Sequence, residues 1–289
     1  MKVSGFTFIR NAILYDYPVV ESIQSILPLC DEVVVAVGNS EDDTLSLIQS
    51  IDPHKIKIIE TIWDDSLREG GRVLAEETDK AFKAIDPDAD WAIYIQGDEV
   101  FHEQDYNTIR QAMEKHLHNK KIQGLLFNYW HFYGSYDYVG SADSWYPHEI
   151  RIIRNDKSIY SYRDAQGFRM GNNKKLKVAP IQAWVYHYGW VKDPKAMQRK
   201  QESFNRYWHD DEWVEKNISK EEAFDYEKHV RELIKFTGEH PKVIQKRIKA
   251  TNWKFDYDPT FSKRSLKHSA KNFLKKYLGL DFSYKNYRL

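Results

Sequence analysis

The 289-residue sequence has one cysteine, Cys30, no net charge and no long apolar run. A single cysteine excludes a disulfide framework and suits a reducing compartment. Because 43 basic residues balance 43 acidic ones, no overall field attracts nucleic acid, and no nucleic-acid partner is expected. No segment approaches the ~20 apolar residues of a membrane-spanning helix. The first residues also lack the basic and apolar regions of a signal peptide, so we expect a cytoplasmic protein.

Two phosphate-binding signatures are absent as well. No G-x-G-x-x-G follows the first predicted strand, and no G-x-x-x-x-G-K-[ST] occurs in the chain. Their absence argues against a dinucleotide-binding fingerprint and against a P-loop. A nucleotide site in this protein would have to be built from other elements.

The first hundred residues alternate between strand and helix patterns. Apolar, β-branched segments predict strands at 3–9, 33–37, 55–60 and 91–96. Amphipathic segments between them predict helices, and Ser40 with Asp43 resembles a capping box at the start of the second one. Continuous apolar strands between such helices predict an α/β fold with a parallel sheet covered on both faces. In such sheets, ligands bind at the carboxyl ends of the strands.

The pattern changes in the rest of the chain. Further strands are predicted at 122–132, 148–154 and 177–186, and 160–169 is predicted to be irregular. After Pro194, helices with charged outer faces are predicted at 195–208, 220–236 and 241–250.

Two acids, Asp98 and Glu99, follow the fourth predicted strand through Gly97. Mg²⁺ and Mn²⁺ prefer carboxylate oxygen and substrate phosphate to softer ligands. A divalent cation at Asp98 could therefore bridge a nucleotide diphosphate and stabilise its charge as it leaves. His187, at the end of a later predicted strand, could complete the coordination of the ion. Taken singly, an acidic loop and one histidine are also typical of ordinary structural positions.

Four segments that occur in order along the chain carry a family resemblance. They are Thr7-Phe8-Ile9-Arg10-Asn11, Gly38-Asn39-Ser40-Glu41-Asp42-Asp43-Thr44, Gln96-Gly97-Asp98-Glu99 and His187-Tyr188-Gly189-Trp190. Together, over roughly residues 3–190, the chain resembles a family 2-type glycosyltransferase with the GT-A fold. The resemblance implies a Rossmann-like, mostly parallel sheet flanked by helices. It also implies a nucleotide-sugar donor, Mn²⁺ or Mg²⁺, and inversion at the anomeric carbon.

The resemblance implies two metal ligands. Asp98 matches the second acid of the family's DxD metal motif, and His187 resembles the later histidine that joins the metal in some members. The chain departs from the family pattern twice: Gln96 replaces the first acid of the motif, and Val37-Gly38 replaces the acid usually found after the second strand. A glutamine can still hydrogen-bond a ribose hydroxyl or a metal-bound water.

The resemblance also implies a wall for the base at Phe8 to Asn11, and a second nucleotide loop at Asn39 to Thr44. Arg68 and Arg72 flank a glycine pair on the same rim and could bind the diphosphate, because arginine suits bidentate phosphate contacts. A solvated charged loop is the alternative for these two. The expected nucleotide-binding residues are Phe8, Arg10, Asn11, Asn39, Asp42, Arg68, Arg72, Gln96 and Asp98.

Inversion by direct displacement requires a base that removes the proton of the acceptor hydroxyl. In the family, the base comes after the strand that follows the metal motif, and Asp164 best fits that order. Glu149 is the second candidate, although it alternates with isoleucines and could simply pair with Arg151. Asp143 is a third candidate.

The resemblance thus implies a hexosyltransferase-type enzyme. It would move one sugar from a nucleotide-diphosphate sugar to a glycan or lipid-linked acceptor, as in cell-surface polysaccharide biosynthesis. The QxxRW motif of processive synthases is missing, which favours a single addition. Two alternatives stay open: a catalytically silent relative that binds nucleotide or glycan, and a sugar nucleotidyltransferase.

Residues 1–190 are expected to form a catalytic domain, with a nucleotide-binding half at 1–100 and an acceptor half at 101–190. Residues 191–289 are expected to form a helical region with a basic tail. Within this region, segment 262–289 combines an apolar helix face with surrounding lysines. Such a helix can lie on anionic lipid at the inner face of the membrane, or it can dock on the body of the protein.

Overall fold

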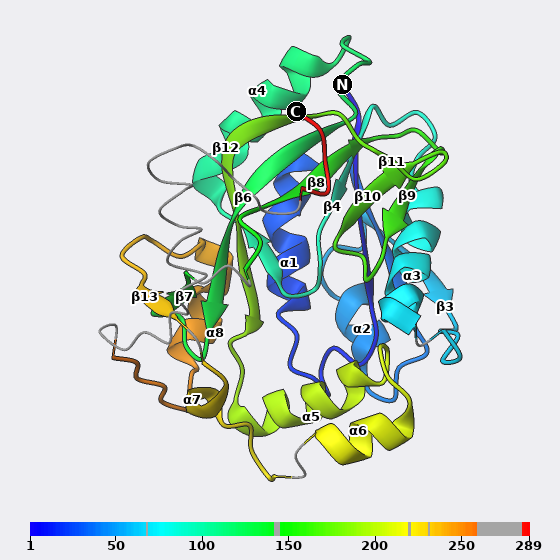
Figure 1. The fold of residues 1–289 in the computed structure, drawn as a ribbon. Helices are drawn as coiled ribbons and strands as arrows, with labels where there is room; N and C mark the ends of the chain where they lie inside the picture. The colour runs from blue at the N-terminus through cyan, green and yellow to red at the C-terminus, as the bar shows by residue number, and fades with distance from the viewer. Residues whose placement is uncertain (68, 142–144, 219–220, 231, 259–284) are drawn as a thin grey trace.

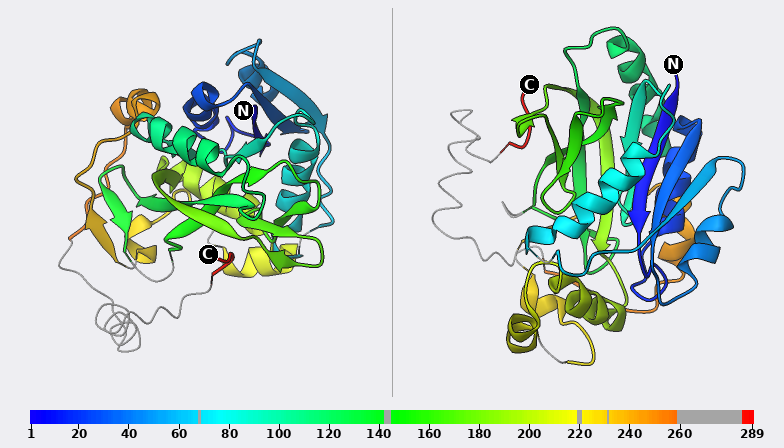
Figure 2. Two further views of the ribbon diagram at one scale, coloured as in Figure 1. Left: turned by 90° about the horizontal axis from the view of Figure 1, so that it is seen from above. Right: turned by 90° about the vertical axis from the view of Figure 1, so that its right-hand side faces the viewer.

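The computed structural model of the protein describes residues 1–67, 69–141, 145–218, 221–230, 232–258 and 285–289. A large sheet runs through the molecule, and helices cover both of its faces (Figures 1 and 2). Its strand order is β13-β7-β6-β8-β4-β1-β2-β3, and β12 and β5 extend it beside β6. The predicted class, α/β with a mostly parallel sheet flanked by helices, is confirmed.

The first half of the chain alternates strands and helices as predicted. The strands are β1 (Val3–Ile9), β2 (Glu32–Gly38), β3 (Ile56–Thr61) and β4 (Trp91–Tyr94). The helices between them are α1 (Val19–Ile26), α2 (Thr44–Gln49) and α3 (Arg72–Lys83). β1 pairs in parallel with β2 and β4, and β2 pairs in parallel with β3. α1 and α2 pack into one core cluster and α3 into another, so β2 is covered on both faces and its sequence is apolar without alternation.

The second half adds antiparallel pairs. Its longer strands are β6 (Gly124–Tyr133), β8 (His148–Arg154) and β12 (Val178–Trp190). Its shorter elements are β5 (Glu99–Phe101), α4 (Tyr106–His116), β7 (Tyr138–Gly140) and β13 (Leu233–Lys235). β8 runs antiparallel between β4 and β6, and β12 runs parallel to β6. Below the carboxyl ends of β6 and β12, Figure 1 shows α5 (Pro194–Asn205) and α6 (Asp211–Asn217) crossing the molecule.

Residues 160–169, predicted to be irregular, form a hairpin. Its strands are β9 (Ile159–Tyr162) and β10 (Gly167–Met170), and β11 (Lys174–Lys175) pairs beside β10. The sequence does not mark the turn, because Arg163 and Ala165 adopt φ values of 58° and 62° there. Glycine or asparagine normally signals this left-handed conformation.

Two helix predictions are also wrong. Of the predicted helix at 220–236, only α7 (Tyr226–His229) is helical within the described residues, and β13 then pairs with β7. Pairing with an exposed strand edge outweighs the helical spacing of this segment. Ser40 does not cap α2, which begins four residues later; its hydroxyl instead accepts from the Asn11 N–H at 3.0 Å.

The end of the chain returns to the sheet. After α8 (Gln245–Lys249), the described residues continue to 258 and resume at 285, and Arg288 forms a parallel bridge with Lys177 beside the start of β12. Most of the basic segment considered for membrane attachment, residues 262–284, lies outside the described residues. Within the part of the chain that the structure describes, no helix is both long and apolar enough to cross a membrane.

A buried ion pair joins the parallel half of the sheet to the antiparallel half. Glu99, the first residue of β5, and Arg151, in the middle of β8, are both fully buried. Two hydrogen bonds of 2.7 Å join the guanidinium to the two carboxylate oxygens. The Tyr129 hydroxyl donates to Glu99 at 2.9 Å, and Arg151 donates to the Gln166 carbonyl at 2.8 Å. Bidentate geometry with these further hydrogen bonds offsets the cost of desolvating two charges.

The substitution Arg151→Met should lower the free energy of unfolding by about 3–5 kcal/mol, because it leaves the Glu99 carboxylate buried without its partner. Urea denaturation followed by tryptophan fluorescence measures this loss. The control is Arg206→Met, which breaks an ion pair with Asp211 that is about half exposed and should cost no more than ~0.5 kcal/mol. A loss below about 1 kcal/mol for Arg151→Met would show that the pair does not stabilise the fold.

Candidate active site

Asp98 lies in the turn that follows β4, at the carboxyl edge of the parallel strands. It is 8% exposed, and its carbonyl accepts from the Tyr188 N–H at 2.8 Å, which ties the turn to β12. The Lys200 ammonium donates to Oδ2 at 3.2 Å, and His187 Nε2 lies 3.7 Å from Oδ1. Burial alone would raise the pKa of Asp98, but nearby positive charge, above all the Lys200 ammonium, lowers it to about 2. Asp98 is therefore a buried carboxylate that stays ionised.

Two hydrogen-bonded histidines fix the tautomer of His187. His131 Nε2 lies 2.8 Å from the Tyr146 carbonyl, and His131 Nδ1 lies 3.1 Å from His187 Nδ1. A carbonyl only accepts, so His131 carries its proton on Nε2, and its Nδ1 accepts from His187 Nδ1–H. Burial lowers the pKa of both rings and favours their neutral form. It follows that His187 Nε2 is an unprotonated lone pair that faces Asp98.

This arrangement fits a divalent cation. A lone pair and a carboxylate oxygen face each other at 3.7 Å, and a bound cation would stabilise both. Gly189 allows the close approach, since a Cβ there would lie 2.6 Å from His187 Nε2 and 2.7 Å from Asp98 Oδ2. His131 orients His187 through its other nitrogen, as is usual for metal-binding histidines. Among the described residues, no group of three or more His, Cys, Asp or Glu could hold a metal ion, so a cation here would also need phosphate or water oxygens.

Two lysines lie beside the Asp98 site. Lys200, on α5, is almost buried, and Lys192 is fully buried, which lowers the pKa of Lys192 well below its usual range. The Lys200 ammonium also donates to the Gly189 carbonyl at 3.0 Å, and the Lys192 side-chain nitrogen donates to the Asp16 carbonyl. The Lys200 and Lys192 nitrogens lie 5.0 Å and 4.4 Å, respectively, from the centroid of the Tyr17 ring.

The side chains expected to form the wall for the base lie around Trp63. The centroids of the Phe8 and Trp63 rings are 5.8 Å apart, and the Arg10 guanidinium lies 5.6 Å from the Trp63 ring. Arg10 also donates to Asp65 at 2.9 Å. Trp63 packs directly over Gly38, where a Cβ would lie 2.3 Å from its Nε1. The indole thus occupies the space beside the end of β2, which explains why a side chain is missing at this position.

Three other expected nucleotide-binding residues brace the loops of the rim. Asn11, Asn39 and Asp42 each accept a backbone N–H from another part of these loops through a side-chain oxygen, at 2.7 to 3.2 Å. Each of these three side chains therefore stabilises the conformation of a loop. Their part in nucleotide binding stays a prediction.

The remaining expected nucleotide-binding residues lie in different settings. Gln96 donates to the Ala165 carbonyl at 3.1 Å, which joins the end of β4 to the β9–β10 turn. Arg72 is exposed at the start of α3 and lies 3.4 Å from Glu76. Arg68 lies outside the described residues.

The candidate bases also differ in setting. Asp164 lies in the β9–β10 turn, where its Cβ would be 2.8 Å from a Cβ built on Gly71, and burial raises its pKa. Glu149, on β8, is 3% exposed, and burial raises its pKa to about 7. Asn286, near the chain end, hydrogen-bonds Glu149. Asp143 lies outside the described residues.

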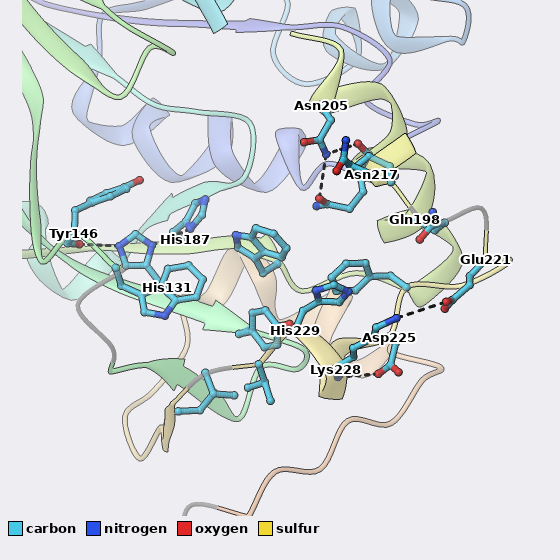
Figure 3. A pocket seen from close by; sticks show the side chains of 18 residues that line it. His131, Tyr146, His187, Gln198, Asn205, Asn217, Glu221, Asp225, Lys228 and His229 are labelled. Carbon is cyan, nitrogen blue, oxygen red and sulfur yellow. Dashed lines mark hydrogen bonds and ion pairs between the residues drawn. The ribbon is translucent and has the colours of Figure 1, made fainter. Parts of the chain in front are cut away.

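A pocket of about 770 Å³ opens beside the two histidines (Figure 3). His131 and His187 lie at one end of it, and Asn205 and Asn217 lie toward the other. Its aromatic lining comes from Tyr133, Trp145, Tyr146, Trp190 and Phe224, and its carboxamides come from Gln198, Gln201, Asn205 and Asn217. Flat rings suit the C–H faces of a sugar, and carboxamides both donate to and accept from hydroxyls. Neither Asp164 nor Glu149 is among its lining residues.

Sequence reasoning missed His131, Lys192 and Lys200. His131 lies in a strand full of aromatic residues, and Lys200 lies in a helix with many charges. Neither position stands out, because each acquires its role only when β6, β12 and α5 meet. The one available signal was that Lys192 and Lys200 closely follow His187 in the chain.

No protein-family model and no curated protein matches the chain. Solved structures match it in fold. One is S. aureus TarS 1–349, at 13% identity and a TM-score of 0.43, over 77% of this chain and 67% of that chain; a complex of it with UDP also matches. Another is 4-diphosphocytidyl-2C-methyl-D-erythritol synthase from Anaerococcus prevotii. It is 12% identical at a TM-score of 0.39, over 66% of this chain and 89% of that chain.

A third similar structure is glucosyl-3-phosphoglycerate synthase from Mycobacterium tuberculosis with Mn²⁺, UDP and phosphoglyceric acid. It is 19% identical at a TM-score of 0.30, over 46% of this chain and 43% of that chain. The likeness is one of fold.

The raised pKa of Glu149 can be tested by comparing how the unfolding free energies of the wild type and Glu149→Gln depend on pH. The pKa of Glu149 is about 7 in the fold and about 4.3 in an unfolded chain. The folded state therefore keeps the proton to higher pH, and stability is greatest below pH ~4 and is lost as pH rises through 7. Between pH 4 and pH 8, the unfolding free energy of the wild type should fall by about 3 kcal/mol relative to Glu149→Gln.

Urea denaturation at several pH values measures this difference. Glu212→Gln, at an exposed position of α6, is the control and should run parallel to the wild type. Parallel curves for Glu149→Gln and the wild type would contradict the raised pKa.

Proposed function

We propose that the protein is a glycosyltransferase that moves one sugar from a nucleotide-diphosphate sugar to a glycan or lipid-linked acceptor. The observation that carries this proposal is the Asp98 carboxylate with His187 and Lys200 beside it. Asp98 lies at the carboxyl edge of a parallel sheet, where ligands of such folds bind. It also adjoins His187, which lines a pocket of aromatic rings and carboxamides.

In this proposal Asp98 and His187 would hold Mn²⁺ or Mg²⁺. The ion, when bound, would supply Lewis-acid stabilisation of the diphosphate oxygens. The protein's part is to orient the two ligands. His131 holds the His187 ring through a 3.1 Å hydrogen bond, and the Tyr188 N–H holds the Asp98 turn at 2.8 Å.

Inverting transfer would be one displacement. The acceptor hydroxyl oxygen bonds to the anomeric carbon while the bond from that carbon to the diphosphate oxygen breaks, and the electron pair leaves with the diphosphate. The hydroxyl proton passes to a carboxylate. We favour Asp164, because its turn adjoins Gln96 through the Ala165 carbonyl and burial strengthens it as a base by raising its pKa. Glu149 is less suited, because Asn286 covers it.

We assign the pocket of Figure 3 to the part of the acceptor away from its reacting hydroxyl, because neither candidate base lines it. Its rings and carboxamides suit a sugar, and its volume of about 770 Å³ is in the range of small-molecule sites. Glu221, Asp225 and Lys228 also line it. A glycan of the cell surface, or the head of a lipid-linked sugar, has this chemistry. The halves of the predicted catalytic domain, 1–100 for the donor and 101–190 for the acceptor, would meet at Asp98.

A thermal-shift panel of nucleoside diphosphates and nucleotide sugars, with and without Mn²⁺, tests the donor assignment. We expect one base to raise the melting temperature, and to raise it more when Mn²⁺ is present, since a ligand that binds only the folded state stabilises it. No shift with any nucleotide would remove the proposal.

The substitution Asp98→Asn should reduce turnover of the donor that the panel identifies by at least about 100-fold, because it removes the charge that holds the cation. Donor hydrolysis, measured by release of the nucleoside diphosphate, provides the readout. The matched control is Asp88→Asn, an exposed position before β4 and therefore at the opposite edge of the sheet. Donor hydrolysis by Asp98→Asn at the wild-type rate would exclude this site.

A further inference from the structure

Helix α5 contributes side chains both to the Asp98 site and to the pocket. Its side chains Gln198, Gln201 and Asn205 line the pocket, while Lys200 reaches Asp98. The start of the helix is fixed, because the Asp193 side chain accepts two backbone N–H groups of its first turn and a proline follows it. The fold therefore fixes the position of Lys200, which is not a mobile side chain on the surface.

Lys192 and Lys200 differ in how they are paired. Lys192 is fully buried, and its side-chain nitrogen donates to a backbone carbonyl, that of Asp16. Among the ion pairs of the described residues, none includes Lys192, and burial lowers its pKa well below the usual range, which favours the neutral amine. The Lys200 ammonium, which is paired with Asp98, is therefore the lysine that presents a positive charge here.

The Lys200 ammonium also has bonding capacity left. Of its three N–H groups, one donates to Asp98 at 3.2 Å and one to the Gly189 carbonyl at 3.0 Å. The nitrogen lies 5.0 Å from the centroid of the Tyr17 ring and 5.6 Å from that of Phe204. Within the described residues, these contacts leave one N–H for a ligand.

We propose that Lys200 binds the diphosphate of the donor. The identity of the ligand rests on the proposed function. The further claim is that a fixed ammonium group, in addition to any divalent cation, holds the diphosphate. Negative charge grows on the diphosphate as its bond to the anomeric carbon breaks, and a cation already in position stabilises it without reorganisation. Lysine is well suited to this role as a point charge for phosphate.

A simpler role for Lys200 is to neutralise Asp98 and nothing more. The two roles differ in their effect on anion binding when metal is removed. If Lys200 binds the diphosphate, the protein retains affinity for a diphosphate in EDTA, and that affinity depends on the charge at position 200. If Lys200 only neutralises Asp98, removing it leaves anion binding unchanged.

Isothermal titration calorimetry of the full chain with inorganic pyrophosphate in EDTA decides between them. Lys200→Met should weaken pyrophosphate binding by at least about 10-fold, which is the loss expected for one hydrogen bond to a charged group. Lys200→Arg, which keeps the charge, should recover most of the loss. The control is Lys195→Met on the same helix, where an exposed lysine pairs with Glu222, and it should bind as the wild type does.

Melting temperatures of all variants establish that they are folded. If Lys200→Met is not, Lys200→Gln replaces it, since glutamine still donates to Asp98 without a charge. Equal pyrophosphate binding by the folded uncharged variant and the wild type would overturn the inference. Wild-type binding that requires Mn²⁺ would overturn it too, while leaving the proposed glycosyltransferase intact. If no nucleotide or pyrophosphate binds under any condition, both proposals fail.

Discussion

The buried ion pair between Glu99 and Arg151 determines where the site can form. Asp98 and Glu99 are neighbours in the chain, but Glu99 turns into the core to meet Arg151, while Asp98 turns to the cleft. Arg151 also donates to the Gln166 carbonyl, so one buried group ties the turn after β4 to β8 and to the hairpin that carries Asp164. Apolar residues of similar volume would often stabilise a core equally well. We infer that the main role of this ion pair is to fix the orientation of the neighbouring Asp98 side chain.

Charged groups meet at this site, although the chain as a whole has no net charge. Asp98 is buried beside the Lys200 ammonium and the lone pair of His187. Electrostatic interactions are strong in buried surroundings, so this ammonium group can attract an anion without any field from the rest of the protein. α5 supplies both Lys200 and part of the pocket, so the proposed donor and acceptor sites share this helix.

Sequence reasoning identified Asp98 and His187 as candidate site residues but missed Lys192 and Lys200. The strand before Asp98 was predictable because a buried parallel strand is apolar without interruption, and His187 lies near the end of a predicted strand, where ligands of parallel sheets bind. Lys192 and Lys200 were not predictable, because their roles depend on how α5 packs under the sheet. The β9–β10 hairpin was missed for a local reason, since Arg163 and Ala165 adopt a backbone that their residue types seldom signal.

The central claim is that Asp98, His187 and Lys200 together hold a diphosphate and its cation. A crystal structure of the full chain, grown with Mn²⁺ and the nucleoside diphosphate that stabilises it, tests this claim most directly. We expect an anomalous Mn²⁺ signal in contact with Asp98 and His187, and a phosphate oxygen within hydrogen-bonding distance of Lys200 Nζ. A nucleotide bound away from Asp98, or one bound there without contact to Lys200, would contradict it.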